Sequence, residues 1–433
     1  MTTTMLERGK TAKKAGIQLS ATDTQTRNAA LAAIADALEA NRAALIAANQ
    51  TDYERSAAES LAAPLLGRLI FDDHKIDDVI DGIHSLIELT DPLGATRMAT
   101  ELDTGLDLYK VTCPIGVIGI IFESRPDAFV QISTLCLKSG NAVLLKGGRE
   151  ALETNRLLCR IISEATASVG IPGGWIQNLE SREDVNAMLA LDDYIDLIIP
   201  RGSNSFVKYI MDHSNIPVMG HSDGICHAYV DASADVDKAV KIAVDAKTQY
   251  VSACNAIETL LVHKDIAGEF LPGLKAGMDQ KQVHLKGDER VRAVIDVEAA
   301  TDDDWSTEYL DYILSIKVVD SLEEAIDHIN TFGSGHTDVI VTEDEAHAKA
   351  FTTLVDSAGV YVNCSSRFAD GFRYGFGAEV GISTSKLHAR GPVGLDGLLS
   401  YKYKLIGHGD IVSDFADGKR SFTHISLDQD CPL

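Results

Sequence analysis

The sequence predicts an α/β protein of two domains, built on mostly parallel sheet with helices on both faces. Three observations predict it. The chain has 433 residues, more than one compact core usually holds. Strand-like runs alternate with helical stretches over most of its length. The strand-like runs are apolar at consecutive positions, which is typical of parallel strands buried on both faces.

The chain opens with helices and a hairpin. Residues 22–60 are rich in alanine and carry apolar side chains such as Leu31, Ile34 and Leu38 at helical spacing. The next distinctive stretch, "TELDTGLDLYKVTCPIG", has two extended runs around an Asp-Thr-Gly turn. This pattern predicts a β-hairpin before the alternation begins.

The first alternating unit follows the hairpin. The run "IGVIGIIF" (115–122) predicts a buried strand, and "RPDAFVQISTLCLKSG" predicts a helix that ends at Gly140. The same unit continues with the strand "NAVLLK", the helix "EALETNRLLCRIISEATASVGIP", the strand "GWIQNL", a helix near 183–190, the strand "YIDLIIP" and a helix from Ser205 to His213.

A second unit begins at "HAYVDASADVDKAVKIAVDAKT", whose helix carries one apolar face. It continues with the strands "ETLLVH", "ILSIKVV", "TDVIVT" and "GVYVN" and a helix at 321–330. Residues 365–397 are then Gly-rich and irregular. Long loops of this composition are often functional.

The composition restricts the classes of function. Lys and Arg number 39 against 64 Asp and Glu, a net charge of −25, which argues against nucleic-acid or membrane partners. Any anionic ligand therefore needs local positive groups. Seven cysteines without a CxxC pair indicate a reducing compartment. No apolar run is long enough to span a membrane, and the first residues lack the apolar core of a secretory signal, so we expect a cytoplasmic protein.

Two loops at the ends of predicted strands are candidate phosphate-binding sites, because ligands of open α/β sheets lie at the carboxyl ends of strands. In "DLIIPRGSNSF", Gly202 and Ser203 lie between a strand and a helix, where free backbone N–H groups bind phosphate. In "VLLKGGRE", Lys146 ends a strand and Arg149 leads into a helix, a cluster suited to a phosphorylated ribose. A helix-capping turn and a solvated turn would give the same patterns, and neither is a GxGxxG or Walker sequence.

Cys254 lies at a third junction, in "KTQYVSACNAIETLLVH", between a helical run and a strand. A thiolate is a strong nucleophile when a cation, a helix dipole or a lowered pKa sustains it. A structural cysteine would fit the same position. His221, Cys226 and His227 match no common zinc spacing, so we expect no metal.

Several stretches together resemble one family. They include "PIGVIGIIFESRPDAF", "CLKSGNAVLLKGGREA", "IPRGSNSFVKYI", "GHSDGICHAYVD", "SACNAIETLLVH", "VNCSSRFADG" and "GFGAEVGISTSKLHARGPVGLDGL". In this order they resemble the gamma-glutamyl phosphate reductases, a proline-biosynthesis branch of the aldehyde dehydrogenase superfamily. The matching stretches run over most of the chain.

The resemblance implies an aldehyde-dehydrogenase-like fold with two Rossmann-like, doubly wound domains and a β-hairpin that builds a homo-oligomer. We expect an NADP-binding domain over residues 1–228, with the oligomerisation hairpin near 100–114. A catalytic domain is expected over 229–390. The segment 391–433 is expected to return to the hairpin through "LLSYKYKLIG".

The resemblance also implies NADPH as cofactor and Cys254 as nucleophile. Lys146 matches the lysine that reaches the adenosine ribose. Gly202 and Ser203 match the turn under the pyrophosphate, and Glu308 matches a glutamate that holds the nicotinamide ribose.

Three positions depart from the hydrolytic aldehyde dehydrogenases. His221 stands where those enzymes carry the glutamate that activates water, which disfavours a hydrolysed thioester. Ser124 replaces an asparagine that helps the oxyanion, so Ser124 and the backbone N–H of Cys254 are candidate oxyanion donors. Arg149 replaces a glutamate that binds a free ribose hydroxyl, which suits the 2′-phosphate of NADP.

Candidate substrate ligands come from the Gly-rich segment. Arg367 and Arg390 suit a carboxylate or a phosphate, and Ser365 and Ser366 are candidate hydrogen-bond donors. Surface or inter-domain ion pairs would equally account for the arginines. We interpret His336 as structural.

The reaction that the resemblance implies is NADPH-dependent reduction of L-glutamyl 5-phosphate to L-glutamate 5-semialdehyde and phosphate, through a thioester on Cys254. Two alternatives stay open: an aldehyde dehydrogenase that hydrolyses its thioester, and a catalytically silent subunit of a biosynthetic complex. A separate glutamate 5-kinase is expected to supply the acyl phosphate, with transient contact between the two enzymes.

Overall fold

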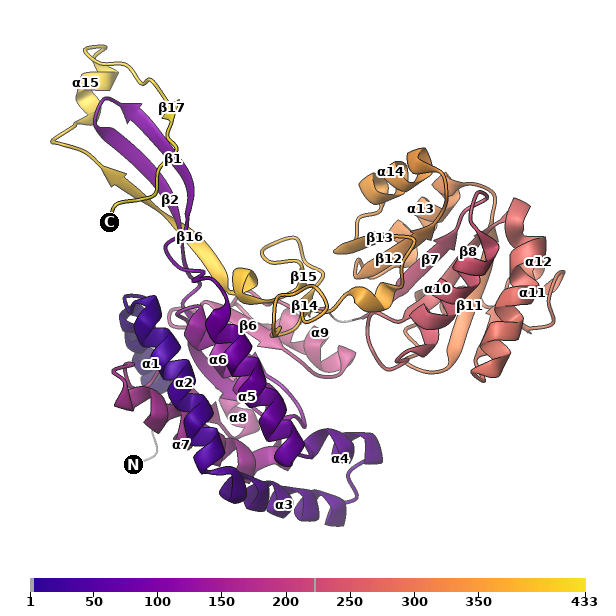
Figure 1. The fold of residues 1–433 in the computed structure, drawn as a ribbon, viewed down its shortest axis with the longest axis horizontal. Coiled ribbons are helices and arrows are strands. Elements are labelled where there is room, and N and C mark those ends of the chain that lie inside the picture. The colour runs from indigo at the N-terminus through magenta and orange to yellow at the C-terminus, as the bar shows by residue number, and fades with distance from the viewer. Residues whose placement is uncertain (1–3, 222) are drawn as a thin grey trace.

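The computed structural model describes residues 4–221 and 223–433, which form two α/β domains and a projecting antiparallel sheet (Figure 1). Among the described residues, no helix is long and apolar enough to cross a membrane. The α/β class and the alternation of strands and helices are confirmed.

The first domain contains a parallel four-stranded sheet in the order β5-β4-β3-β6. Its strands are β3 (Val117–Ile121), β4 (Ala142–Lys146), β5 (Ile176–Leu179) and β6 (Leu197–Pro200). Its helices are α1 (Met5–Leu19), α2 (Thr24–Ala40), α3 (Arg42–Ala58), α4 (Ala63–Leu69), α5 (Asp73–Glu88), α6 (Pro126–Lys138), α7 (Leu152–Ser168), α8 (Arg182–Leu189) and α9 (Asn204–His213), with a 3-10 turn η1 (Arg149–Ala151).

Local sequence explains these elements. Every residue of β3 and β4 is buried, as the continuous apolar runs predict. Helix α6 begins with Pro126, whose missing N–H costs nothing at a first helical position. It ends before Gly140, which has a φ of +73° that favours glycine.

The second domain contains a parallel seven-stranded sheet in the order β10-β9-β11-β8-β7-β12-β13. Its strands are β7 (Cys226–Val230), β8 (Ile257–His263), β9 (His284–Gly287), β10 (Glu298–Ala299), β11 (Ile313–Val319), β12 (Thr337–Val341) and β13 (Gly359–Val362). Its helices are α10 (Val236–Thr248), α11 (Lys264–Gln280), α12 (Glu289–Arg292), α13 (Leu322–Phe332) and α14 (Glu345–Leu354), with the 3-10 turns η2 (Asp302–Ser306) and η3 (Ser366–Phe368).

The third part is a sheet in the order β16-β2-β1-β17, which projects away from both domains (Figure 1). The predicted hairpin is β1 (Thr96–Asp103) and β2 (Leu106–Pro114), and β16 (Leu399–Ile406) pairs with β2 along its whole length. The remaining elements are β14 (Ile382–Ser383), β15 (Gly391–Pro392), η4 (Leu395–Leu398), α15 (Val412–Ala416) and β17 (Ile425–Ser426).

Two of the expected domain limits are wrong. A boundary at residue 228 falls inside β7, a fully buried strand of the second sheet, so the second domain begins earlier. The expected limit at 390 is too late, because Val380 is buried in the hydrophobic core of the first domain together with Leu398. The chain thus leaves the second domain after η3 and returns to the first, which sequence periodicity could not show in a Gly-rich segment.

Candidate active site

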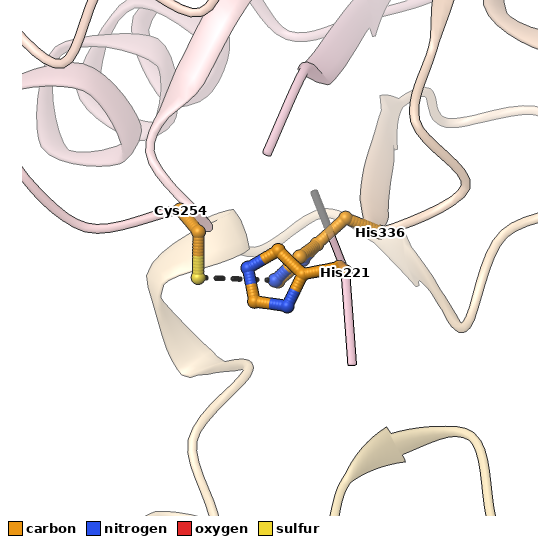
Figure 2. Close-up of side chains that lie close together, drawn as sticks. All are labelled: His221, Cys254 and His336. Carbon is orange, nitrogen blue, oxygen red and sulfur yellow. Dashed lines mark hydrogen bonds between the residues drawn. The ribbon is translucent and has the colours of Figure 1, made fainter. Parts of the chain in front are cut away.

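The sulfur of Cys254 lies among imidazole rings. Its Sγ is 3.2 Å from Nε2 of His336, and the ring of His221 lies edge-on to that of His336 with 5.0 Å between the centroids (Figure 2). One ligand-capable atom from each of the three residues lies within 4.8 Å of the others. Cys254 is partly buried, and His336 is buried.

Parallel strand order brings these residues together. Cys254 comes shortly before β8 and His336 directly before β12, and β7 lies between these two strands. The amino ends of parallel strands meet at one edge of a sheet. Gly224, just before β7, lies at that edge. A Cβ at this position would lie 2.3 Å from the carbonyl oxygen of Cys254 and 2.6 Å from the Cα of Cys254. Only glycine fits there.

The electrostatics favour a neutral thiol beside a neutral imidazole. Burial raises the pKa of Cys254 to about 12, and the carboxylates of Glu308 and Glu379 add to this, while the guanidinium groups of Arg201 and Arg367 oppose it. Burial, with a smaller contribution from His221, lowers the pKa of His336 to about 3. The thiol therefore donates its hydrogen to Nε2 of His336 near neutral pH.

His336, interpreted as structural from the sequence, lies against the Cys254 sulfur and is therefore a candidate base. The ring is fixed from its other side, because Nδ1 lies 2.9 Å from Oγ1 of Thr337. Its only sequence signal is a histidine after Gly-Ser-Gly at a strand start. Glu379, whose pKa is raised by burial, is a second residue near the sulfur that the sequence did not single out.

The turn η3 holds the backbone next to Cys254. The hydroxyl of Ser366 donates to the carbonyl of Asn255 at 2.5 Å, and the Asn255 amide donates to the carbonyl of Ala369 at 2.7 Å. The hydroxyl of Ser365 accepts from the backbone N–H of Arg367 at 3.3 Å. Both serines are buried: the Ser366 hydroxyl fixes the segment that carries Cys254, whereas the Ser365 hydroxyl caps its own turn.

The two expected arginines differ in their surroundings. Arg367 is largely buried, its Nε donates to Gln249 at 2.9 Å, and its charge acts on Cys254. Arg390 instead pairs with Asp356, at 3.3 Å to the carboxylate and 2.9 Å to the carbonyl. Arg201, which follows β6, also acts on the sulfur.

The carboxyl ends of the first sheet carry the predicted cofactor residues. Lys146 ends β4 and is buried, with Nζ donating to the Gly147 carbonyl at 2.6 Å. Arg149 is 79% exposed, with a 3.4 Å contact to Glu59. These groups fit a phosphorylated ribose, since one charge is buried and the other is accessible.

The turn between β6 and α9 fits a pyrophosphate. Gly202 and Ser203 are exposed there, and Ser203 makes no side-chain capping bond to the helix N-terminus that it precedes. The first N–H groups of α9 thus have no side-chain cap from that residue, which suits an anion.

Glu308 connects the two domains. Its Oε2 accepts from the amide of Asn204, the first residue of α9, at 2.6 Å. That amide also donates to Asp223 at 3.0 Å. Glu308 therefore lies beside the turn at Gly202 and Ser203, and its charge also acts on the Cys254 sulfur.

Ser124 is placed differently from what the sequence predicts for an oxyanion donor. Both its hydroxyl and its backbone N–H donate to Oε1 of Glu150 at 2.6 Å. A hydroxyl has one hydrogen to donate, so Ser124 cannot serve an oxyanion while it holds Glu150. The residue adopts a φ of +42°, unusual for a non-glycine, which these two bonds help to hold.

The fold and the site define an aldehyde dehydrogenase type of oxidoreductase. The profile of the aldehyde dehydrogenase family matches residues 5–302 and 294–391. The chain is 64% identical over 421 residues to the gamma-glutamyl phosphate reductase of Acetivibrio thermocellus, covering 97% of this chain and 98% of the relative. It is 65% identical over 410 residues to that of Ruminiclostridium cellulolyticum, covering 95% of each.

The solved structure of gamma-glutamyl phosphate reductase from Thermotoga maritima matches with a TM-score of 0.92 at 41% identity, covering 94% of this chain and 99% of that chain. Within the aldehyde dehydrogenase family, the chain belongs to the gamma-glutamyl phosphate reductases.

Proposed function

We propose that the chain reduces L-glutamyl 5-phosphate to L-glutamate 5-semialdehyde and phosphate with NADPH, through a thioester on Cys254. The observation that carries this proposal is the thiol of Cys254 against the imidazole of His336, on an edge of the second domain that Glu308 connects to Asn204 of the first. The names of its relatives support the substrate.

In the first half of the reaction, Nε2 of His336 takes the thiol proton as Sγ bonds to the acyl carbon. The developing oxyanion accepts from the backbone N–H of Cys254. The carbon–oxygen bond to phosphate then breaks, and the imidazolium of His336 gives its proton to the departing phosphate. The charges of Arg201 and Arg367, which already act on the sulfur, favour the anionic substrate there.

For the second half, bound NADPH supplies the hydride that reduces the thioester. Arg149 and Lys146 would hold the phosphorylated ribose of this cofactor, the turn at Gly202 and Ser203 would hold its pyrophosphate, and Glu308 would hold its nicotinamide ribose. The sulfur leaves as a thiolate and takes a proton from solvent. Covalent capture divides one difficult reduction into two easier steps.

The reverse reaction tests this function. With glutamate semialdehyde as substrate, reduction of NADP is expected to require inorganic phosphate, because phosphate must release the acyl group from Cys254. The measurement is NADPH formation with and without phosphate, at constant ionic strength kept with chloride. Equal rates in both buffers, with free glutamate as product, would establish the hydrolytic alternative instead.

Replacement of Arg149 by alanine is expected to raise KM for NADPH by roughly 10- to 100-fold, the value of one charge-assisted hydrogen bond to a phosphate. KM for NADH should change little, because NADH lacks the 2′-phosphate. Arg156→Ala is the matched control, since Arg156 is half-exposed on the adjoining helix and pairs with Glu180 at 2.6 Å. Equal changes for both cofactors would exclude the role of Arg149.

A further inference from the structure

His221 is a third potential ligand beside the sulfur that the proposed reaction does not use. Its Nδ1 lies 3.0 Å from the carbonyl oxygen of Ile382. A carbonyl oxygen can only accept a hydrogen bond, so Nδ1 carries the hydrogen and Nε2 keeps its lone pair. Figure 2 shows the ring of His221 beside the sulfur of Cys254.

His336 is also held through its Nδ1, here by a hydroxyl group. Its Nδ1 contacts Oγ1 of Thr337 at 2.9 Å, and its Nε2 faces Sγ of Cys254 at 3.2 Å. Both imidazoles are thus fixed through one nitrogen and present the other to a common point. Outer hydrogen bonds of this kind orient the histidine ligands of metal ions.

The spacing suits one tetrahedral ion. Zinc–sulfur and zinc–nitrogen bonds place two ligand atoms of one tetrahedral site roughly 3.6 Å apart. The sulfur and Nε2 of His336 are already slightly closer than this, and the widest separation in the cluster is within 4.8 Å. Small rotations of the side chains would close the site and leave a fourth position open.

We propose that His221, Cys254 and His336 form a reversible inhibitory site for a borderline-soft divalent cation of the zinc type. Thiolate and imidazole are the ligands that such a cation prefers, and oxygen-preferring cations such as magnesium do not match them. On binding, the S–H bond breaks, its proton passes to solvent and a sulfur–metal bond forms, without oxidation or reduction. The ion inhibits because it occupies the lone pairs of the nucleophile and its base.

Binding is measured apart from activity. The reduced, metal-free protein is titrated with zinc against a chromophoric chelator, and about one ion per chain is expected. Cobalt(II) is the spectroscopic probe: a tetrahedral site with a thiolate gives a thiolate-to-cobalt charge-transfer band. Zinc should inhibit turnover at the same occupancy, and a chelator should restore it. Zinc and cobalt binding are measured without substrate, so these results test the metal site whether or not the acyl phosphate is the substrate.

Variants separate this site from other zinc ligands. His221→Gln and Cys254→Ser should each weaken zinc binding by more than about 100-fold, since even loss of an outer partner costs 10- to 100-fold. Cys254→Ser should also lose the charge-transfer band. His213→Gln and Cys431→Ser, on α9 and in the C-terminal tail, are the matched controls and should bind as the parent does.

Circular dichroism shows whether each variant is folded. If His221→Gln does not fold, the cobalt spectrum of Cys254→Ser alone tests the proposal. Zinc affinity unchanged in Cys254→Ser, or a cobalt complex of the parent without a thiolate band, would overturn the proposal.

Discussion

Cys254→Ala is expected to lose more than about a thousandfold in turnover, because the variant lacks the thiol that forms the thioester in the proposed reaction. NADPH affinity should be nearly unchanged, since Lys146, Gly202 and Ser203 are on the first domain and do not depend on the thiol. Steady-state rates measure the first expectation. Titration of NADPH fluorescence measures the second.

Mass spectrometry tests the proposed covalent step directly. Mixing the parent protein with acyl phosphate in the absence of NADPH should leave an acyl group on the peptide that contains Cys254, detected by mass spectrometry. Cys113→Ala is the matched control, because Cys113 is on β2 of the projecting sheet. Retained turnover in Cys254→Ala, or an adduct on another cysteine alone, would contradict the role of Cys254.

His336→Gln is expected to slow the reaction by roughly 10²- to 10⁴-fold at neutral pH, the usual contribution of a general base. It should also change the pH profile. In the parent, the pKa of His336 is lowered to about 3 and that of Cys254 is raised to about 12. The base is therefore unprotonated and the thiol intact between these values, and the rate should stay nearly flat from pH 6 to 9.

Without the base, only the small thiolate fraction reacts. That fraction grows about tenfold per pH unit below the thiol pKa, so the rate of the variant should rise with this slope. The measurement is kcat/KM against pH for both proteins, on the chemical step. His388→Gln is the control, an exposed histidine of the Gly-rich segment. A flat profile in His336→Gln would show that His336 only positions the sulfur.

The predicted cofactor residues of the first domain follow the rule that ligands lie at the carboxyl ends of strands. Lys146 is the last residue of β4, and Gly202 lies in the loop after β6. In the second domain, Cys254 and His336 precede their strands, so the candidate site is at the amino ends. The hydrogen bond from Asn204 to Glu308 shows that the carboxyl edge of the first sheet faces the amino edge of the second. Sequence patterns within one domain carry no information about how another domain faces it.

Local patterns in the sequence identified most strands and helices and the family, and they singled out Cys254 as the candidate nucleophile. Buried parallel strands require continuous apolar runs, turns with positive φ favour glycine, and phosphate loops require small residues before a helix. Each of these features can therefore be predicted from a few neighbouring residues. The tertiary structure decided which distant groups meet. His336 is 82 residues from Cys254 in the sequence. It reaches the sulfur only because β8 and β12 both lie next to β7 in a parallel sheet, so that their amino ends are close together. Strand order follows from packing between elements, which no local pattern encodes.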